Sequence, residues 1–418
     1  MKKILLFVLA ALGSVSFASA QLYNNPLLKA YIPGQENTYR HRLEAGGSYE
    51  LASTGITNQF FNKYLYSNFF DSTTKEAVLS KLGDKNRLGA HTEQYLFYTW
   101  KKKNSENTGF YTMLKNRRHY ASAFTNDAFG VLFFGNSRYA GQKAVFDGSG
   151  YYRNIYQTLQ AGMYTKAGKN LTIGGGIGFA RGSGFMDFNI NKGSLYTSQI
   201  GDSIALHADA DAQYTNLKMS GNQAIGFGAL ASFFAVYNLD ERSFIQISAN
   251  DVGFLHVNKF SHTYQTNQQI IYKGYEINSY NNTFNNGDNR LLPQKLYDQV
   301  DSAVTDNEFT VALPAQIHLQ YKQYLGKKTA ALLGAEYFVS AKHIPAFHIN
   351  ISQEIAPWLA LRGGVNLLGY SKVGFNVNAS ATIAKSWFLN LGSDHIEGFF
   401  TQENTFGQGA YVSLGKGF

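Results

Sequence analysis

The densest cluster of basic residues in the chain is formed by Lys115, Arg117 and Arg118. Three cations at this spacing suit a constriction that selects anionic or amphipathic solutes, as rings of basic side chains do in pores. The same cations could instead form a charge ladder with acids such as Glu93, in which each charge is neutralised. The sequence leaves both interpretations open.

The other residue types that carry chemistry do not form a recognisable active site. The histidines are scattered, and none lies in a nucleophile motif, so a Ser-His hydrolase is not predicted. His318 and His348 alternate with apolar residues, as do Glu336 and Arg362, and we expect all four on the polar face of strands that line a lumen. The absence of cysteine excludes disulfides and thiolate metal sites, and the aspartates between 202 and 211 lack the Gly and Glu of a calcium loop. We therefore expect no enzyme activity, no metal and no cofactor.

Most of these polar side chains belong to an alternating run that fills the C-terminal quarter of the chain. From Phe309 to Tyr321 every second residue is apolar, and the alternation continues with few breaks to Ile383. Such alternation places apolar and polar side chains on opposite faces of strands. Short polar turns at 326–328 and 369–372 indicate an antiparallel meander. The strands reach about ten residues, the length that a tilted strand needs to cross a bilayer.

Because the polar face also carries large charged groups suited to a watery lumen, we predict an all-β fold, a transmembrane antiparallel β-barrel, rather than a soluble sandwich. Roughly 28 residues for each strand and its connection give about fourteen strands between residues 21 and 418. Hydrophobic residues make up 44% of the chain, yet the mean hydropathy is only −0.24, which suits alternating strands. Aromatic residues reach 15%, as expected if rings line both membrane interfaces.

The two ends of the chain favour the outer membrane. Lys2 and Lys3 precede an apolar stretch that ends in Ala18-Ser19-Ala20, so residues 1–20 read as a signal peptide cleaved after Ala20. No later apolar run is long enough for a helical span, and an exported chain without one can be integral only as a closed barrel. The terminal Phe418 resembles the signal by which barrel-assembly machinery recognises outer-membrane strands. We expect outer-membrane lipid as a partner and no nucleic acid.

Two segments interrupt the strands and are expected to form short helical plugs, at 53–87 and 120–142. The stretch Ala128 to Phe134 is so apolar that it must be buried in protein, and the barrel interior is the available place. Phe129, Phe133 and Phe134 would then form the core of the plug. The first segment could instead lie outside, at the periplasmic mouth. A long irregular region at 274–306 is expected to be extracellular.

Residues 135–141, residues 151–153 and the Leu313-Pro314 step into the final meander carry a resemblance to a known family. They resemble a Bacteroidota family of outer-membrane proteins of unknown function, similar in architecture to the FadL-like long-chain fatty-acid transporter barrels. The resemblance implies an approximately fourteen-stranded barrel with an N-terminal plug. The broader group also includes PorV- and PorP-like subunits of the type IX secretion machinery, so the fold alone does not assign a function.

Two functions therefore remain. The first is a plugged, porin-like channel or transporter for small hydrophobic or anionic solutes, which requires a continuous lumen or a displaceable plug. The second is a non-conducting barrel that scaffolds protein partners in an envelope complex such as the type IX secretion system, which requires a sealed lumen and an exposed docking surface. We favour transport.

Overall fold

The computed structural model describes residues 39–67, 71–102, 107–216, 223–273, 304–384 and 386–418. The expected signal peptide and most of the expected long loop at 274–306 lie outside the described residues.

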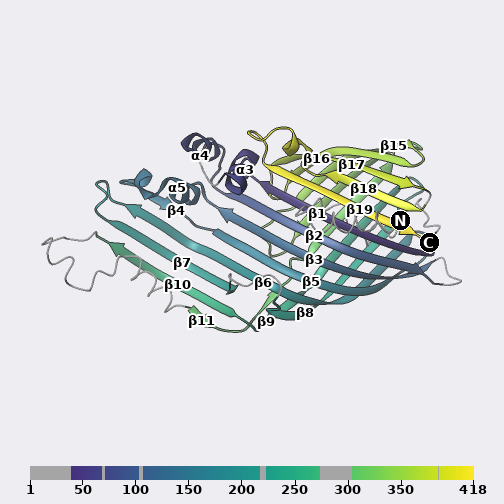
Figure 1. Cartoon of the computed structure of the whole chain (residues 1–418), viewed down its shortest axis with the longest axis horizontal. Helices are drawn as coiled ribbons and strands as arrows, with labels where there is room; N and C mark the ends of the chain where they lie inside the picture. The colour runs from purple at the N-terminus through teal and green to yellow at the C-terminus, as the bar shows by residue number, and fades with distance from the viewer. Residues whose placement is uncertain (1–38, 68–70, 103–106, 217–222, 274–303, 385) are drawn as a thin grey trace.

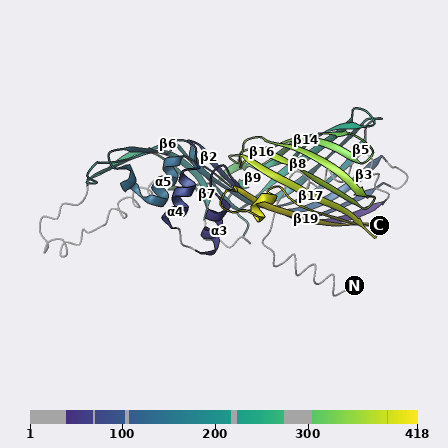
Figure 2. The same cartoon turned by 90° about the horizontal axis from the view of Figure 1, so that it is seen from above.

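The described chain forms a closed antiparallel β-barrel of 14 strands, as the alternation predicted. Each strand pairs with the next one in the ring, and β19 pairs with β1 through matches such as Val412 with Gly47, which closes the wall. Figures 1 and 2 show this barrel at one end of an elongated molecule. The wall strands, in ring order, are β1 (His41–Ser53), β2 (Asn86–Lys101), β3 (Thr108–Phe124), β5 (Ser149–Lys166), β6 (Leu171–Thr197), β8 (Gly226–Asn238), β9 (Ser243–Val257), β13 (Gln316–Tyr324), β14 (Thr329–Phe338), β15 (Ala346–Ala356), β16 (Leu359–Leu368), β17 (Val373–Ile383), β18 (Trp387–Ser393) and β19 (Gly407–Gly417).

The two ends of the barrel differ in their connections. At one end, which we call the turn end, strands are joined by segments as short as residues 167–170, 239–242 and 325–328, and the C-terminus lies there (Figure 1). At the opposite end, which we call the loop end, the chain leaves the wall in helices and in additional strands. Among the described residues, the helices and additional strands therefore lie at the loop end of the barrel.

The largest elaboration is a sheet that continues from the wall at the loop end. The first part of β6, Leu171 to Gly182, pairs with β8 inside the barrel wall. Its second part, Met186 to Thr197, pairs instead with β7 (Ile204–Thr215). We call this second part and its neighbours the outer sheet. Its other strands are β4 (Lys143–Val145), β7, β10 (Ser261–Tyr272) and β11 (Val304–Asp306), and β12 (Phe309–Ala312) pairs separately with β9.

Short helices lie at the loop end, and each of the three α-helices begins at a side-chain cap. Thr57, Asp71 and Thr125 accept hydrogen bonds from backbone N–H groups in the first turns, as capping residues do. None of the described helices is long and apolar enough to cross a membrane. The helices are α3 (Asn58–Tyr66), α4 (Ser72–Leu79), α5 (Asn126–Phe134), η1 (Asn136–Tyr139) and η2 (Ile396–Phe399).

The α-helices do not plug the barrel. They form one apolar cluster in which Phe60, Val78 and Phe129 pack together with Leu88 and other wall residues. Leu88 alternates with Gly89, whose missing side chain leaves room for Tyr370 inside the barrel, so Leu88 faces outward. The helices therefore lie against the outer side of the wall at the loop end. We call this apolar cluster, which also includes Phe133 and Phe134, the helix cluster.

The expected plug at 120–142 is thus placed wrongly, and so are Phe129, Phe133 and Phe134 as plug residues. For the segment 53–87 the plug interpretation is also wrong, whereas the alternative position outside the barrel agrees with its packing against the outer side of the wall. The requirement that apolar helices be buried still holds. They satisfy it by burying one another, as in the Phe129–Phe133 ring contact at 4.4 Å, and by covering the wall from outside. Among the described residues, side chains of the wall strands and of the turn between β16 and β17 fill the lumen.

The outer face of the barrel has the character of a lipid-facing surface. Along β17, Val377 is 39% exposed and its neighbour Asn378 is 6% exposed, which matches the expected alternation of outward apolar and inward polar residues. At the turn end, Trp100 stacks between Tyr98 and Phe110 at ring distances of 5.4 and 5.6 Å. Such aromatic residues mark the membrane interface. Phe418 follows the last residue of β19, donates its backbone N–H to His41 O at the start of β1, and is exposed. Its role in insertion stays a prediction.

Candidate functional site

The barrel interior near the turn end is closed by aromatic side chains from the wall. Phe97, Tyr111, Tyr164, Phe234 and Phe244 form one buried cluster, which we call the aromatic layer. Glycines in β6 make room for it, because an added Cβ at Gly174 would lie 2.4 Å from the Phe234 ring and one at Gly176 2.4 Å from the Tyr111 hydroxyl. The glycine-rich part of β6 therefore packs against rings of the wall and not against a plug.

Above the aromatic layer lies a buried network of ion pairs, which we call the ion layer. Lys115 Nζ lies 2.6 Å from Asp251 Oδ1, and Arg117 Nη1 lies 2.9 Å from Asp251 Oδ2. Arg117 also pairs with Glu93. Tyr156 donates a further hydrogen bond of 3.2 Å to Asp251. These charges are almost completely buried, so each depends on its partner for stabilisation.

Asp251 is the centre of the ion layer, and its backbone is unusual. Its φ is +56°, in the left-handed region that a non-glycine residue rarely adopts. The conformation coincides with an irregularity in the pairing of β8 and β9 between Ala231 and Phe233, and the Asp251 N–H donates to Ser232 Oγ at 3.0 Å. The irregular register turns the Asp251 carboxylate toward both cations of β3.

Amide side chains extend the ion layer across the lumen. Arg117 donates to Gln316 Oε1 at 3.1 Å, and Gln316 in turn donates to Glu336 Oε1 at 3.0 Å. The structure thus brings together Lys115, Arg117 and Glu336, three residues singled out from the sequence. Asp251 and Gln316, which join them, were not singled out. The available signal for Asp251 was that it is the single acid in its strand.

The other candidate residues are spread over the molecule. His318 and His348 are buried in the lumen, where His348 Nδ1 lies 2.8 Å from Asn366 Oδ1. Arg362 has the same strand parity as the buried Asn366 and therefore faces inward. Arg118 is exposed on the outside of the wall, because it lies on the opposite face of β3 from Lys115 and Arg117.

The prediction of an anion-selecting basic cluster therefore needs correction. Arg118 points away from the lumen, and the charges of Lys115 and Arg117 are balanced by Glu93 and Asp251. The neutral charge ladder with Glu93 describes this layer better. Spacing along β3 reveals which residues share a face, but it cannot reveal the acid that β9 brings from across the lumen.

Toward the loop end, the lumen is closed by a third group of side chains. His91 and His119 contact each other through their Nδ1 atoms at 3.1 Å, and His119 Nε2 lies 2.7 Å from the Tyr370 hydroxyl. Tyr370 comes from the turn between β16 and β17 and donates to Ala341 O at 2.5 Å. Phe338 packs its ring on both histidines. The described lumen is therefore closed by wall and loop side chains at three levels.

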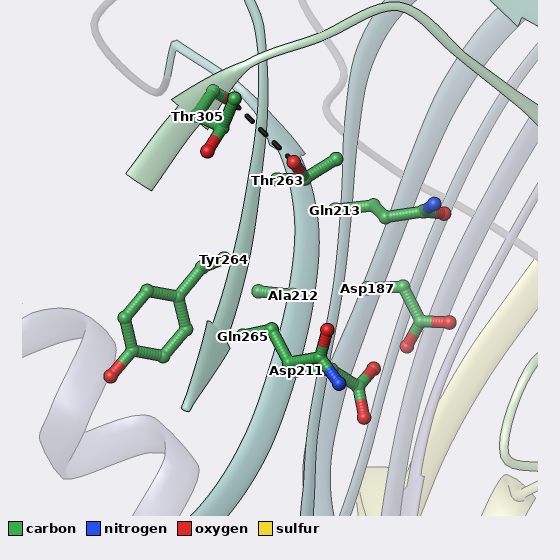
Figure 3. Close-up of a pocket in the computed structure, with 8 residues that line it drawn as sticks. All are labelled: Asp187, Asp211, Ala212, Gln213, Thr263, Tyr264, Gln265 and Thr305. Atoms are coloured by element: carbon green, nitrogen blue, oxygen red, sulfur yellow. Dashed lines mark hydrogen bonds between the residues drawn. The ribbon is translucent and has the colours of Figure 1, made fainter. Parts of the chain in front are cut away.

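A polar pocket of about 460 Å³ lies on the outer sheet (Figure 3). Asp187, Gln213 and Thr263 stand opposite one another on β6, β7 and β10. Asp187 lies two residues beyond Phe185, which packs inside the barrel, so the pocket continues the lumen-facing side of β6. The remaining lining residues are Asp211, Ala212, Tyr264, Gln265 and Thr305.

The electrostatics of this pocket are set by Asp187 and Lys342. Burial raises the pKa of the Asp187 carboxyl, and the nearby Lys342 ammonium opposes that rise. Lys342 Nζ lies 3.5 Å from Asp187 Oδ1 and donates to Asn189 Oδ1 at 2.6 Å. The pocket is lined by carboxylate, amide and hydroxyl groups, which suit a polar solute. Among the described residues, no group of three or more His, Cys, Asp or Glu side chains could hold a metal ion.

Comparisons with known proteins add the following. A family model described as a family of unknown function, DUF5723, matches residues 30–389. No curated protein matches the chain.

Solved structures with similar folds include outer-membrane channels. A deletion mutant of the monoaromatic hydrocarbon channel TodX has 13% identity and a TM-score of 0.49 over 96% of this chain and 95% of that chain. The toluene transporter TodX of Pseudomonas putida has 12% identity and a TM-score of 0.45 over 94% and 93% of the two chains. A FadL homologue of Pseudomonas aeruginosa has 9% identity and a TM-score of 0.45 over 94% and 92%. At these values the barrel assignment rests on the strand pairing described above.

Proposed function

This chain belongs to the DUF5723 family, and we propose that it is an outer-membrane barrel that transports small apolar or amphipathic solutes through a gated lumen. The ion layer carries this proposal. Burying ion pairs is costly, and apolar packing of the same volume is often at least as stable. Strongly desolvated charges that converge in a lumen are therefore a signature of function.

The closure consists of side chains, and this suits a gate. The rings of the aromatic layer, such as Phe97 and Tyr111, can change rotamer without breaking any pairing between wall strands. Ion pairs within one layer can exchange partners, because Arg117 already contacts Glu93, Asp251 and Gln316. The gate would open by side-chain rearrangement and not by removal of a plug.

The solute class follows from the lining of the lumen. The aromatic layer and the cluster around Tyr152 and Phe338 are apolar, while the ion layer pairs two cations with two acids. A path of this kind favours solutes with apolar surface and gives no general advantage to anions. In barrels of this type short turns face the periplasm, so the polar pocket on the outer sheet would meet solutes from outside.

The test is conductance of purified protein in planar bilayers. We expect the wild type to be nearly silent. The double variant Phe97→Ala and Tyr111→Ala removes two rings from the aromatic layer and should show more frequent or larger openings. The double variant Phe133→Ala and Phe134→Ala removes two rings from the helix cluster and should behave like the wild type. If a correctly folded Phe97/Tyr111 variant stays as silent as the wild type, the gated-lumen proposal fails.

One observation favours the second function, a non-conducting scaffold of an envelope machine. Near the end of α3, Tyr64 and Tyr66 are 60% and 83% exposed, and Phe400 next to η2 is 79% exposed. The two segments are neighbours, because the Gln59 N–H donates to Gln402 O at 2.9 Å. Exposed apolar residues of this kind suit a protein partner. A stable stoichiometric partner in a pull-down from native membrane, together with silent lumen variants, would support the scaffold over transport.

A further inference from the structure

The outer side of β2, β3, β5 and β6 changes character within one or two residues. Toward the turn end it carries exposed apolar side chains, among them Leu96, Leu114 and Leu159 at 47%, 51% and 60% exposure. One outward position closer to the loop end, these strands carry Gln94, Asn116 and Gln157 instead. The change marks the upper limit of the lipid-facing band on this side of the barrel.

The polar residues at this limit form a continuous chain of hydrogen bonds. Asn116 donates to Gln94 Oε1 at 2.9 Å, Gln157 donates to Asn116 Oδ1 at 3.0 Å, and Arg181 donates to Gln157 Oε1 at 3.0 Å. The chain runs across four strands at one level. It holds the Arg181 guanidinium in place directly above the lipid-facing residues.

Arg118 and Arg153 lie next to this chain, and with Arg181 they form what we call the arginine patch. Arg118 stands opposite Ile155 on β5, diagonal to both Arg153 and Gln157, and Arg181 stands opposite Gln157. Diagonal neighbours in a sheet are about 7–8 Å apart, within reach of long side chains. The Arg153 guanidinium lies over Gly184, where an added Cβ would come within 3.1 Å of its Nη2.

Acidic residues are scarce on the strands that carry the arginine patch. In β2, β3, β5 and the part of β6 up to Arg181, the only acidic residue is Glu93, which faces the lumen and pairs with Arg117. Within the described chain, Arg118 and Arg153 form no ion pair. The patch is also confined to one sector, because β9, β15 and β17 carry the exposed aromatic residues Phe254, Phe347 and Phe375 near their loop ends.

We propose that the arginine patch binds the phosphate groups of an anionic lipid in the leaflet at the loop end. Lipid phosphates lie just beyond the hydrocarbon region, which is the level of Arg118, Arg153 and Arg181. Guanidinium groups bind phosphate oxygens in bidentate fashion, and they are more weakly hydrated than ammonium groups. The Gln157 amide, itself bonded to Asn116, fixes Arg181 against the wall, so less freedom of this side chain is lost on binding. This inference is independent of whether the lumen conducts.

The proposal is tested by lipid binding to the purified full-length barrel in neutral detergent. The probes are phosphatidic acid, whose headgroup is a phosphate monoester, and phosphatidylcholine, whose phosphate is covered by a choline. Wild type should bind phosphatidic acid more tightly. In the double variant Arg118→Gln and Arg153→Gln, the affinity for phosphatidic acid should fall roughly fivefold for each arginine removed. Arg118→Lys with Arg153→Lys should retain part of the affinity, because the charge remains but the bidentate geometry is lost.

A charge-matched control is available at the turn end, where Lys327 and Lys328 are exposed. Lys327→Gln with Lys328→Gln removes the same number of positive charges and should leave binding unchanged. Equal losses in the two double variants would show that net charge alone attracts the lipid, and the proposal would be overturned. Unchanged binding in a folded Arg118/Arg153 variant would overturn it as well, and so would competition by inorganic phosphate at concentrations similar to those of the lipid.

Discussion

Two buried regions of this protein are filled in opposite ways. The ion layer lies on the barrel axis and is made of charged side chains, Glu93, Lys115, Arg117 and Asp251. The helix cluster lies outside the wall and is made of apolar side chains such as Phe60 and Phe129. The apolar helix α5 therefore lies outside the barrel wall, while charged residues occupy the barrel axis.

The reason is the alternation of the wall strands. A barrel that shows an apolar face to lipid must turn its polar residues toward its own axis, and in a closed lumen those residues must satisfy one another. The helices are free of this constraint and bury their apolar sides in the ordinary way. Whether a wall side chain is buried in the lumen therefore depends on the strand face that carries it and not on its hydrophobicity.

The largest expected effect comes from breaking the ion layer. Asp251→Ala leaves Lys115 and Arg117 with incompletely compensated charges, so the free energy of unfolding should fall by roughly 3–5 kcal/mol. Urea titration of the folded barrel in lipid vesicles measures this change. The double variant Asp251→Ala with Lys115→Met removes one acid and one cation together and leaves Arg117 paired with Glu93, so it should recover much of the loss. A single variant as stable as wild type would show that these charges are not coupled.

A somewhat smaller effect is expected on the lipid face of the same wall. Val377 is an outward residue near the middle of β17, and Val377→Arg should cost roughly 2–4 kcal/mol in a membrane-folding assay. Ile383 ends the same strand at the turn end and is also exposed. Ile383→Arg should cost only about 0–1 kcal/mol, because the cost depends on depth. Equal costs at both positions would contradict the assigned lipid-facing band.

The loop end should add a dependence on pH. His395, in the loop between β18 and β19, is buried, which opposes its protonation, but its contacts with Glu397 at 3.1 Å and Glu50 at 3.6 Å prevail and raise its pKa to about 10. A raised folded-state pKa means that this contribution is complete below about pH 6.5 and is lost as pH rises through about 10. Losing these charge-assisted contacts should cost about 2 kcal/mol. Thermal unfolding of wild type between pH 7 and 10 should show the loss, and His395→Asn should remove this dependence.

The smallest expected effect is on the helix cluster. Thr125 Oγ1 accepts a hydrogen bond of 3.0 Å from Ala128 N at the start of α5, and Thr125→Ala should destabilise this helix by about 1 kcal/mol. Hydrogen exchange should become faster in α5 while the unfolding of the barrel stays unchanged, because no wall pairing depends on this cap. Thr125→Ser keeps the hydroxyl and should behave like wild type. A barrel that unfolds earlier in Thr125→Ala would show that the helix cluster and the wall form one cooperative unit.

Much of the fold could be predicted from local pattern. The alternation from Ile317 to Ile383 predicted the meander and its inward and outward residues. The beginning of the same run was predicted wrongly, because Phe309, Val311 and Leu313 are buried in the core and do not face lipid. The position of the helices could not be predicted this way. The sequence of an apolar stretch such as Ala128 to Phe134 predicts that the stretch is buried, but it does not predict what buries it. Phe60 and Val78, which pack against this stretch, come from another part of the chain.

The sequence by itself contains the alternation that places Lys115 and Arg117 on one strand face and Arg118 on the other, although the three residues were grouped as one basic cluster. Only the tertiary structure decided what these residues meet. Asp251 reaches them from β9 through a local irregularity with left-handed backbone, and Arg153 and Arg181 join Arg118 through the register of three strands. Side-chain direction follows from the two-residue period of a single strand. Partners follow from register and closure, which arise only when distant strands pair.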